Sequence, residues 1–250
     1  MIDTHAHLNF PDFDKDLEQV IGESFKNGVE KIIIPGSDVL NSKKAVEIAG
    51  EHENIFAAVG IHPHYTDEDF SKLIELAKNK KVVAIGECGL DYFRLEGDIT
   101  GNQKAQKELF SKHLELAQKT DLPLIFHNRE SDGDFLEMVK GQNVRGVVHC
   151  FTADWSFARE ALDLGFLISF TGIITFDKTG KLEEVIKNIP LAKIMVETDS
   201  PLLAPVPYRG QRAEPWMVRE IIQKIADIKG VLPEEAEEMT TTTAKNFFGI

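Results

Sequence analysis

The chain lacks several features that define whole classes of protein. It has only two cysteines among 250 residues, Cys88 and Cys150, which excludes a fold held together by a network of disulfides. It has no run of about 18 apolar residues, so no segment has the length of a transmembrane helix. Its N-terminal residues lack the basic and then apolar pattern of a secretory signal. We therefore expect a cytoplasmic protein that makes no membrane contact.

Positive charge is also scarce. Lys and Arg number 28 against 41 Asp and Glu, which gives a formal net charge of −13. This balance excludes a protein that coats nucleic acid with a broad basic surface, because such binding depends on cationic side chains that release counterions. It does not exclude an enzyme that obtains positive charge from bound metal. Hydrophobic residues make up 42% of the chain, enough to form a sizeable core.

Eight short apolar runs alternate with longer amphipathic segments along the chain. The runs consist almost entirely of Val, Ile, Leu, Ala and Phe, which is typical of strands buried on both faces of a parallel sheet. Their starts recur about every 25–30 residues, the spacing of strand–helix units. The expected strands are Ile2–Thr4, Val29–Pro35, Ile55–Ile61, Val82–Gly86, Leu122–Phe126, Arg145–His149, Phe166–Phe170 and Ala192–Val196.

This alternation predicts the α/β class and, within it, a (β/α)₈ TIM barrel that forms a single domain over residues 1–250. The alternative is an open doubly wound sheet, but no Gly-x-Gly-x-x-Gly follows the first strand. The expected helices are Asp14–Asn27, Leu40–His52, Asp67–Asn79, Asn102–Thr120, Phe135–Lys140, Trp155–Leu164, Lys181–Asn188, Glu214–Lys229 and Pro233–Phe247.

Histidines and carboxylates gather where the expected strands end. His5 and His7 follow the first strand, and the alternation of side chains along a strand puts both on one face. In a parallel barrel the carboxyl ends of all strands share the face that carries active sites. Six of the eight histidines lie at such ends, and His52 and His113 are the exceptions. The site is therefore expected on this face.

The residue types at these ends indicate a metal centre. Four imidazoles and two carboxylates suit Zn²⁺, Mn²⁺ or Fe²⁺, and less clearly Mg²⁺. A carboxylate such as Glu87 can bridge two ions about 3.5–4 Å apart, which stabilises the attacking and leaving oxygens of a phosphoryl displacement. We therefore expect two divalent ions, Zn²⁺, Mg²⁺ or Mn²⁺. The predicted ligands are His5, His7, Glu87, His127, His149 and Asp199.

Taken in order, the motifs at the strand ends resemble those of the TatD family of metal-dependent hydrolases, which are related to the amidohydrolases. The resemblance covers essentially the whole chain. It implies a TIM barrel with two divalent metals that hydrolyses nucleic-acid phosphodiesters, often as a 3′→5′ exonuclease on single strands, and for some members D-aminoacyl-tRNA deacylation. The motifs are Asp3–Leu8, Gly60–His64, Gly86–Asp91, His127–Arg129, His149–Phe151 and Glu197–Pro201.

The resemblance also implies a role for each residue. His62 would contact the substrate phosphate, Asp199 would handle the proton of the attacking water, and Glu87 would join the two metals, so these three are the predicted catalytic residues. One metal would be held by His5, His7, Glu87 and Asp199, and the other by Glu87, His127 and His149. The sequence departs from the family after the last strand, where Arg209–Pro215 lacks the usual Lys and Asn.

Three further side chains have two interpretations each. Arg209 is shaped to bind a substrate phosphate, but the arginines of its loop could instead pair with acids, including Glu214. Arg129, two residues after a predicted ligand, would contact substrate or form a salt bridge with Asp91 or Glu130. Asp91 would orient a metal-bound histidine, since such rings usually donate their second N–H to an acceptor, or it would cap the following segment.

We therefore predict a monomeric or small homo-oligomeric hydrolase that acts on single-stranded DNA ends through a hydroxide held by two metals. In one alternative, the same metal centre hydrolyses an ester, lactone or amide, including the ester of D-aminoacyl-tRNA, instead of a phosphodiester. The other is a binding protein built on an inactive barrel, although the complete set of ligands argues against it.

Overall fold

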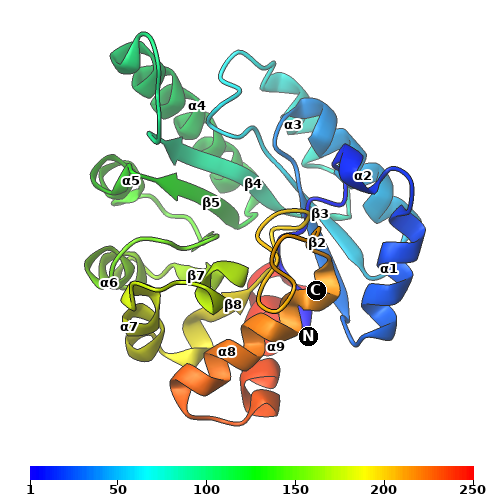
Figure 1. Ribbon diagram of the computed structural model, residues 1–250. Helices are drawn as coiled ribbons and strands as arrows, with labels where there is room; N and C mark the ends of the chain where they lie inside the picture. The colour runs from blue at the N-terminus through cyan, green and yellow to red at the C-terminus, as the bar shows by residue number, and fades with distance from the viewer.

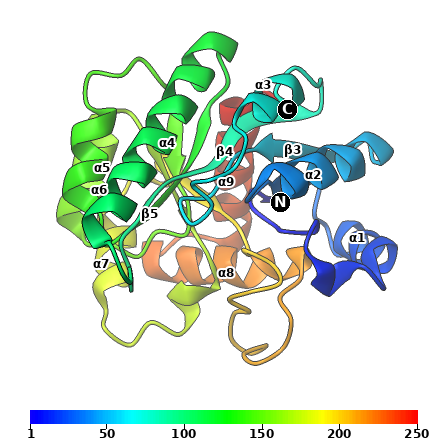
Figure 2. The same ribbon diagram turned by 90° about the horizontal axis from the view of Figure 1, so that it is seen from above.

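Eight parallel strands form one sheet in which each strand pairs with the next in the sequence. The structure is a computed structural model that describes residues 1–250, and the helices lie around the outside of the strands (Figures 1 and 2). The predicted TIM barrel is confirmed. The strands are β1 (Ile2–Asp3), β2 (Lys31–Pro35), β3 (Ile55–Val59), β4 (Val82–Asp91), β5 (Leu124–Arg129), β6 (Gly146–Val148), β7 (Leu167–Phe170) and β8 (Ile194–Val196).

Hydrogen bonds between the segments that follow β8 and β1 bring the two edges of the sheet together. The Thr4 amide donates to the Val196 carbonyl at 3.2 Å, and the Asp199 amide donates to the His5 carbonyl at 2.9 Å. The His7 amide donates to the Ser200 carbonyl at 2.8 Å. The same contacts that join the edges therefore place the histidines of the first strand beside the aspartate of the last.

The helices occupy the predicted segments, with ends that differ by a few residues. Asp38, Asp98 and Asp154 each cap a helix N-terminus by accepting a backbone N–H. None of the helices is long and apolar enough to cross a membrane. The helices are α1 (Leu17–Lys26), α2 (Val39–Glu51), α3 (Ser71–Leu76), α4 (Ile99–Thr120), α5 (Asp132–Val139), α6 (Trp155–Asp163), α7 (Lys181–Asn188), α8 (Val218–Lys229) and α9 (Pro233–Phe248).

The predicted ends of two strands were wrong, because β4 runs on to Asp91 and β5 to Arg129. The apolar pattern stops at Gly86 and Phe126, but backbone pairing resumes after a register shift and continues to the ends of both strands. Gly89 permits this close approach, since a Cβ atom there would clash with the His127 carbonyl. His127 therefore lies inside a paired strand, and Glu87 lies at the register shift, where its N–H donates to the Gly36 carbonyl at 2.9 Å. Both residues are thus held by the backbone of the barrel.

A cluster of phenylalanines supports β5 from the side opposite the site. Phe126 packs against Phe135 and Phe166 with ring centroids 5.1 Å apart, and against Phe110 at 5.8 Å. All four rings are buried. This tight packing fixes the backbone on either side of Phe126 and so fixes the position of the neighbouring His127.

Candidate metal centre

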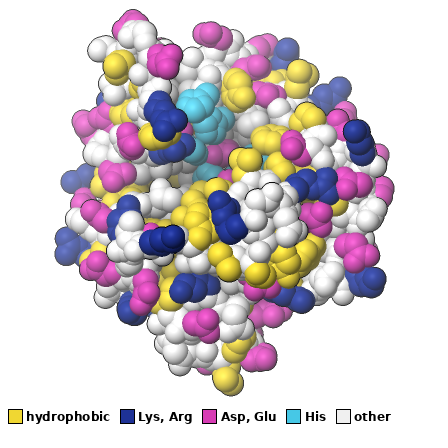
Figure 3. All heavy atoms as spheres, viewed as in Figure 1, with side chains coloured by type: hydrophobic (Ala, Val, Ile, Leu, Met, Phe, Trp, Pro, Cys, Tyr) yellow, Lys and Arg dark blue, Asp and Glu magenta, His cyan; other side chains and the backbone are white.

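The carboxyl ends of the strands open into a cavity of about 610 Å³. Figure 3 shows histidine side chains at the bottom of a hollow on this face. Five of the six predicted metal ligands line the cavity, and His5 lies fully buried behind them. The lining ligands are His7, Glu87, His127, His149 and Asp199.

Four donor atoms from three strand ends surround a single point. The His5 and His7 Nε2 atoms are 3.2 Å apart, and each lies 3.5–3.7 Å from Glu87 Oε2 and from Asp199 Oδ1. Ligands that hold one ion tetrahedrally at about 2.1 Å stand about 3.4 Å from one another. The spacing of these four residues therefore fits a single divalent metal ion.

The other oxygen of Glu87 faces a second set of donors. Glu87 Oε1 lies 2.7 Å from His127 Nδ1 and 2.7 Å from His149 Nε2. The two imidazole nitrogens are 3.4 Å apart. Each oxygen of one carboxylate thus meets its own pair of histidines, which is the arrangement that a carboxylate bridging two metal ions requires.

Asp91 contacts the nitrogen of His127 that faces away from Glu87. Its Oδ2 lies 2.9 Å from His127 Nε2, and its Oδ1 accepts the Phe93 N–H at 2.9 Å. The proton of His127 is then held at Nε2, which leaves the Nδ1 lone pair free for a metal. Asp91 thus makes both of the contacts considered for it, since one oxygen faces His127 and the other accepts a backbone N–H of the segment that follows.

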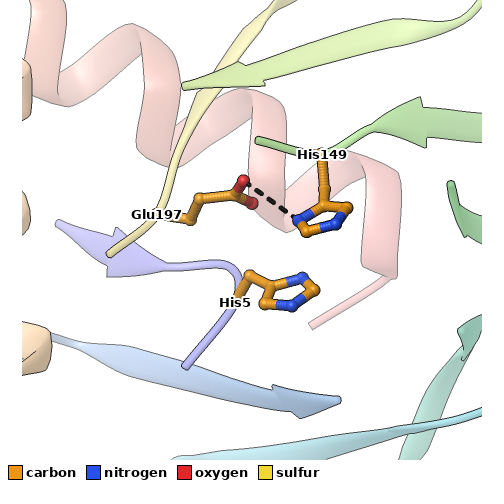
Figure 4. A group of neighbouring side chains, drawn as sticks. All are labelled: His5, His149 and Glu197. Carbon is orange, nitrogen blue, oxygen red and sulfur yellow. Dashed lines mark ion pairs between the residues drawn. The ribbon is translucent and has the colours of Figure 1, made fainter. Parts of the chain in front are cut away.

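Glu197, for which the sequence predicted no role, faces His149 at ion-pair distance, although His149 Nδ1 has no hydrogen-bond partner. Its Oε1 lies 3.5 Å from His149 Nδ1 and accepts the Cys150 N–H at 2.6 Å, as Figure 4 illustrates. The His149 ring also stacks on His5 with centroids 4.1 Å apart. The available signal was its position two residues before Asp199, since alternating residues of an extended segment face the same way.

Asp3 is a second buried carboxylate without a predicted role. It accepts the backbone N–H groups of His5 at 3.2 Å and Thr198 at 3.0 Å, and the Thr198 hydroxyl at 2.5 Å. Burial raises the pKa of Asp3 to about 8, because no cation offsets its desolvation. Asp3 therefore ties the segment that carries His5 to the one that carries Asp199.

The pKa shifts show how closely the charges of the centre interact. Burial opposes the ionisation of Glu87, yet His149 and His127 hold its pKa well below its ordinary value. Burial also opposes charge on His149, yet the Glu87 carboxylate raises the pKa of His149 well above its ordinary value. Glu87 is thus ionised at neutral pH and needs positive charge beside it. A divalent metal fits this need, because it can replace the protons on the histidines.

His62 lies beside the second set of donors. Its Nε2 is 3.8 Å from Glu87 Oε1, and its ring centroid is 4.4 Å from that of His127. The backbone N–H of His64 donates to His62 Nδ1 at 3.3 Å, so the proton of the neutral ring sits on Nε2. Burial lowers the pKa of His62 to about 3. The structure therefore presents a neutral N–H donor next to the metal ligands.

Arg129 and Arg209, both predicted substrate contacts, and Arg212 of the same loop as Arg209 have different surroundings. Arg129 lines the cavity and forms a salt bridge with neither Asp91 nor Glu130, since its guanidinium lies 3.6 Å above the Phe93 ring. Arg209 is not among the lining residues, because it donates to the Ala204 carbonyl at 2.9 Å. Arg212 pairs with Asp16 at 2.7 Å and Glu214 at 3.0 Å, as the alternative interpretation of that loop expected.

Comparisons with known proteins agree with this geometry. The chain is 40% identical to YabD of Bacillus subtilis (strain 168), an uncharacterized metal-dependent hydrolase, over 100% of this chain and 99% of that protein. It is 35% identical to YcfH of Escherichia coli (strain K12), described in the same words, over 100% of this chain and 96% of that one.

Among solved structures, YjjV from Escherichia coli K12 superposes with a TM-score of 0.91 at 28% identity, covering 100% of this chain and 98% of its own. A TatD family hydrolase from Entamoeba histolytica gives 0.89 at 26% identity, covering 99% and 97%. The family model of TatD related DNase matches residues 2–249. The chain therefore belongs to the TatD related DNase family of metal-dependent hydrolases, as its motifs predicted.

Proposed function

We propose that this enzyme hydrolyses phosphodiester bonds at the ends of single-stranded DNA, removing nucleotides in the 3′→5′ direction. The observation that carries the proposal is the placement of Glu87, whose two oxygens face two separate sets of donors. Two ions bridged in this way suit an in-line displacement at phosphorus, because they stabilise both the attacking and the leaving oxygen. The family description as DNases supports the choice of substrate.

The proposed metal sites use the donors described above. When bound, two divalent ions of Zn²⁺, Mg²⁺ or Mn²⁺ would polarise the phosphate and supply a hydroxide at neutral pH. The first would be held by His5, His7, Glu87 and Asp199, and the second by Glu87, His127 and His149.

Four side chains have proposed roles in proton transfer or substrate binding. Asp199, a member of the first set, accepts the proton of the attacking water, because the neighbouring histidines lower its pKa despite burial and so keep it ionised. The neutral His62 ring donates a hydrogen bond from its Nε2–H group to a phosphate oxygen and keeps its proton. Arg129 contacts the strand at the edge of the cavity. Arg209, which the sequence analysis proposed as a substrate contact, would reach substrate only by leaving the Ala204 carbonyl.

The net charge of −13 fits a site that admits a short strand end and binds long duplexes weakly. Both cysteines are free, and Cys88 is buried, which fits the reducing cytoplasm where we propose that the enzyme works, as a monomer or small homo-oligomer.

A labelled oligonucleotide tests the proposal. The 5′-labelled single strand is incubated with protein and Mg²⁺ or Mn²⁺, with Glu87→Ala as the site variant and Glu238→Ala, an exposed residue of α9, as the matched control. We expect a ladder of products shortened from the 3′ end for the wild type and the control, and none for Glu87→Ala or with EDTA. A wild-type protein that carries metal and leaves the strand intact would overturn the proposal.

One observation keeps carbonyl substrates as a second candidate. The loop Arg209–Pro215 lacks the Lys and Asn of the family pattern, and apolar Ile173, Leu202 and Leu203 line part of the cavity. An ester or lactone would need less positive charge than a strand with several phosphates, and D-aminoacyl-tRNA would present an ester carbonyl rather than a phosphate to the metal ions. Metal-dependent hydrolysis of such a carbonyl substrate, without cleavage of DNA, would favour this candidate.

A further inference from the structure

Two arginines stack on the Phe93 ring, and one of them, Arg129, lines the cavity. The Arg129 guanidinium lies 3.6 Å from the Phe93 ring centroid, and the Arg94 guanidinium lies 4.6 Å from the same centroid. Neither guanidinium forms a salt bridge, although Arg212 elsewhere in the chain pairs with two carboxylates. In a chain with 41 acidic residues, two arginines without a carboxylate partner beside the cavity leave positive charge available to an anionic ligand.

The position of this stack relative to the metal ligands follows from the strands. His127 and Arg129 are two residues apart on β5 and so share a face, with Cα atoms about 6.6 Å apart. Arg129 pairs in register with Asp91 of β4, and the Arg129 carbonyl accepts the Tyr92 N–H at 2.9 Å. Phe93 then follows at once. Consecutive phosphates of a nucleic-acid strand are separated by a distance of the same order as these Cα atoms.

The aromatic ring prepares the arginines for binding phosphate. A guanidinium that lies flat on a ring keeps its N–H edges exposed and loses less freedom when it binds. Those edges match the oxygens of a phosphate in a two-pronged contact. Figure 3 shows dark blue Lys and Arg side chains directly beside the cyan histidines of the cavity. The positive charge therefore borders the centre itself.

We infer that Arg129, Phe93 and Arg94 form a second phosphate subsite, which binds the phosphate adjacent to the one being cleaved. This inference rests on the proposed function and narrows its substrate class. The preferred substrate is then an oligonucleotide with at least two phosphodiesters, rather than a simple diester with a single phosphate. The metal centre acts on one phosphate while the stack holds its neighbour.

Two substrates separate this subsite from the metal centre. Bis(4-nitrophenyl) phosphate carries one phosphate, and a short single-stranded oligonucleotide carries several. For Arg94→Gln and Arg129→Gln we expect kcat/KM on the oligonucleotide to fall about tenfold each, mainly through KM. Arg94 is exposed, so Arg94→Gln should leave kcat/KM on the small diester within about twofold of wild type. Arg159→Gln on the outer helix α6 is the matched control and should change neither.

Binding without turnover gives an independent measurement. Fluorescence anisotropy of the labelled oligonucleotide in EDTA is measured over a range of salt concentrations. Each substitution should reduce the slope of log K against log salt by about 0.7, the value for one phosphate contact on a single strand. Phe93→Leu should weaken binding while leaving the slope nearly unchanged, because both charges remain.

The results that overturn the inference are distinct from failure of the proposed function. If Arg94→Gln and Arg129→Gln keep the wild-type salt slope, or if Arg94→Gln lowers the turnover of both substrates equally, there is no second phosphate subsite. If the wild type cleaves neither substrate, the proposed function fails, and the anisotropy slopes still decide whether the arginines bind phosphate.

Discussion

Replacing Asp91 by Asn tests whether His127 is held as a metal ligand. Asp91 is buried, and its Oδ2 lies 2.9 Å from His127 Nε2. Although burial opposes its ionisation, the hydrogen bond to His127 lowers the pKa of Asp91, so the carboxylate is charged at neutral pH. Asparagine keeps the shape and the contact with Phe93 but loses that charge. The His127 ring then becomes a weaker ligand and can turn.

The expected magnitude follows from the position of Asp91 behind a ligand. Groups that orient metal-bound histidines contribute about 10–100-fold to metal affinity or activity, which is about 1.4–2.7 kcal/mol. Calorimetric titration of metal into the metal-free protein should show affinity lowered by this factor at one of two sites, with a matching fall in kcat. Asp163→Asn, an exposed change at the end of α6, is the control. Wild-type affinity and activity for Asp91→Asn would refute the reasoning.

Three other perturbations have defined outcomes. Adding Zn²⁺ or Mn²⁺ to metal-free protein at about 100 times Kd should stabilise it by about 2.7 kcal/mol for each site filled. One filled site should raise Tm by about 5–10 °C in differential scanning fluorimetry, and an unchanged Tm would argue against a metal centre. Burial lowers the pKa of His113 from 6.5 to about 4. Between pH 6.5 and about 4, His113 is protonated in the unfolded state and neutral in the folded state, so the free energy of unfolding falls as pH is lowered through this range. Urea unfolding should show the wild type losing about 2 kcal/mol more than His113→Gln between about pH 7.5 and pH 5, whereas parallel losses would contradict a neutral buried ring. Phe126→Ala removes the centre of the phenylalanine cluster and should cost about 3–5 kcal/mol in the same assay; a cost below about 1 kcal/mol would mean that the cluster is loosely packed.

The number, order and parallel direction of the strands could be predicted because burial on both faces leaves a continuous apolar run. Strand ends could not be predicted in the same way. Glu87 and His127 break the apolar pattern, yet pairing of β4 with β5 resumes at Cys88, directly after Glu87, and includes His127. The apolar pattern indicates which side chains are buried in apolar surroundings. The end of a strand depends instead on backbone hydrogen bonds, which polar residues also make.

The candidate ligands could be proposed from their places at the strand ends, and the structure brings all six together. Their supports were harder to find. Glu197 and Asp3 act through partners distant in sequence, His149 for Glu197 and Thr198 for Asp3, and only the closed barrel brings these residues into contact. The sequence also could not show that Arg209 donates to the Ala204 carbonyl. That contact depends on how the loop between them folds.

The central claim is that Glu87 bridges two metal ions within one site. Electron paramagnetic resonance of protein loaded with two equivalents of Mn²⁺ tests it most directly, because two ions that share a carboxylate are magnetically coupled. The account predicts a coupled spectrum for the wild type and the spectrum of isolated Mn²⁺ for Glu87→Ala. A wild-type protein that binds Mn²⁺ and shows only isolated ions would contradict it.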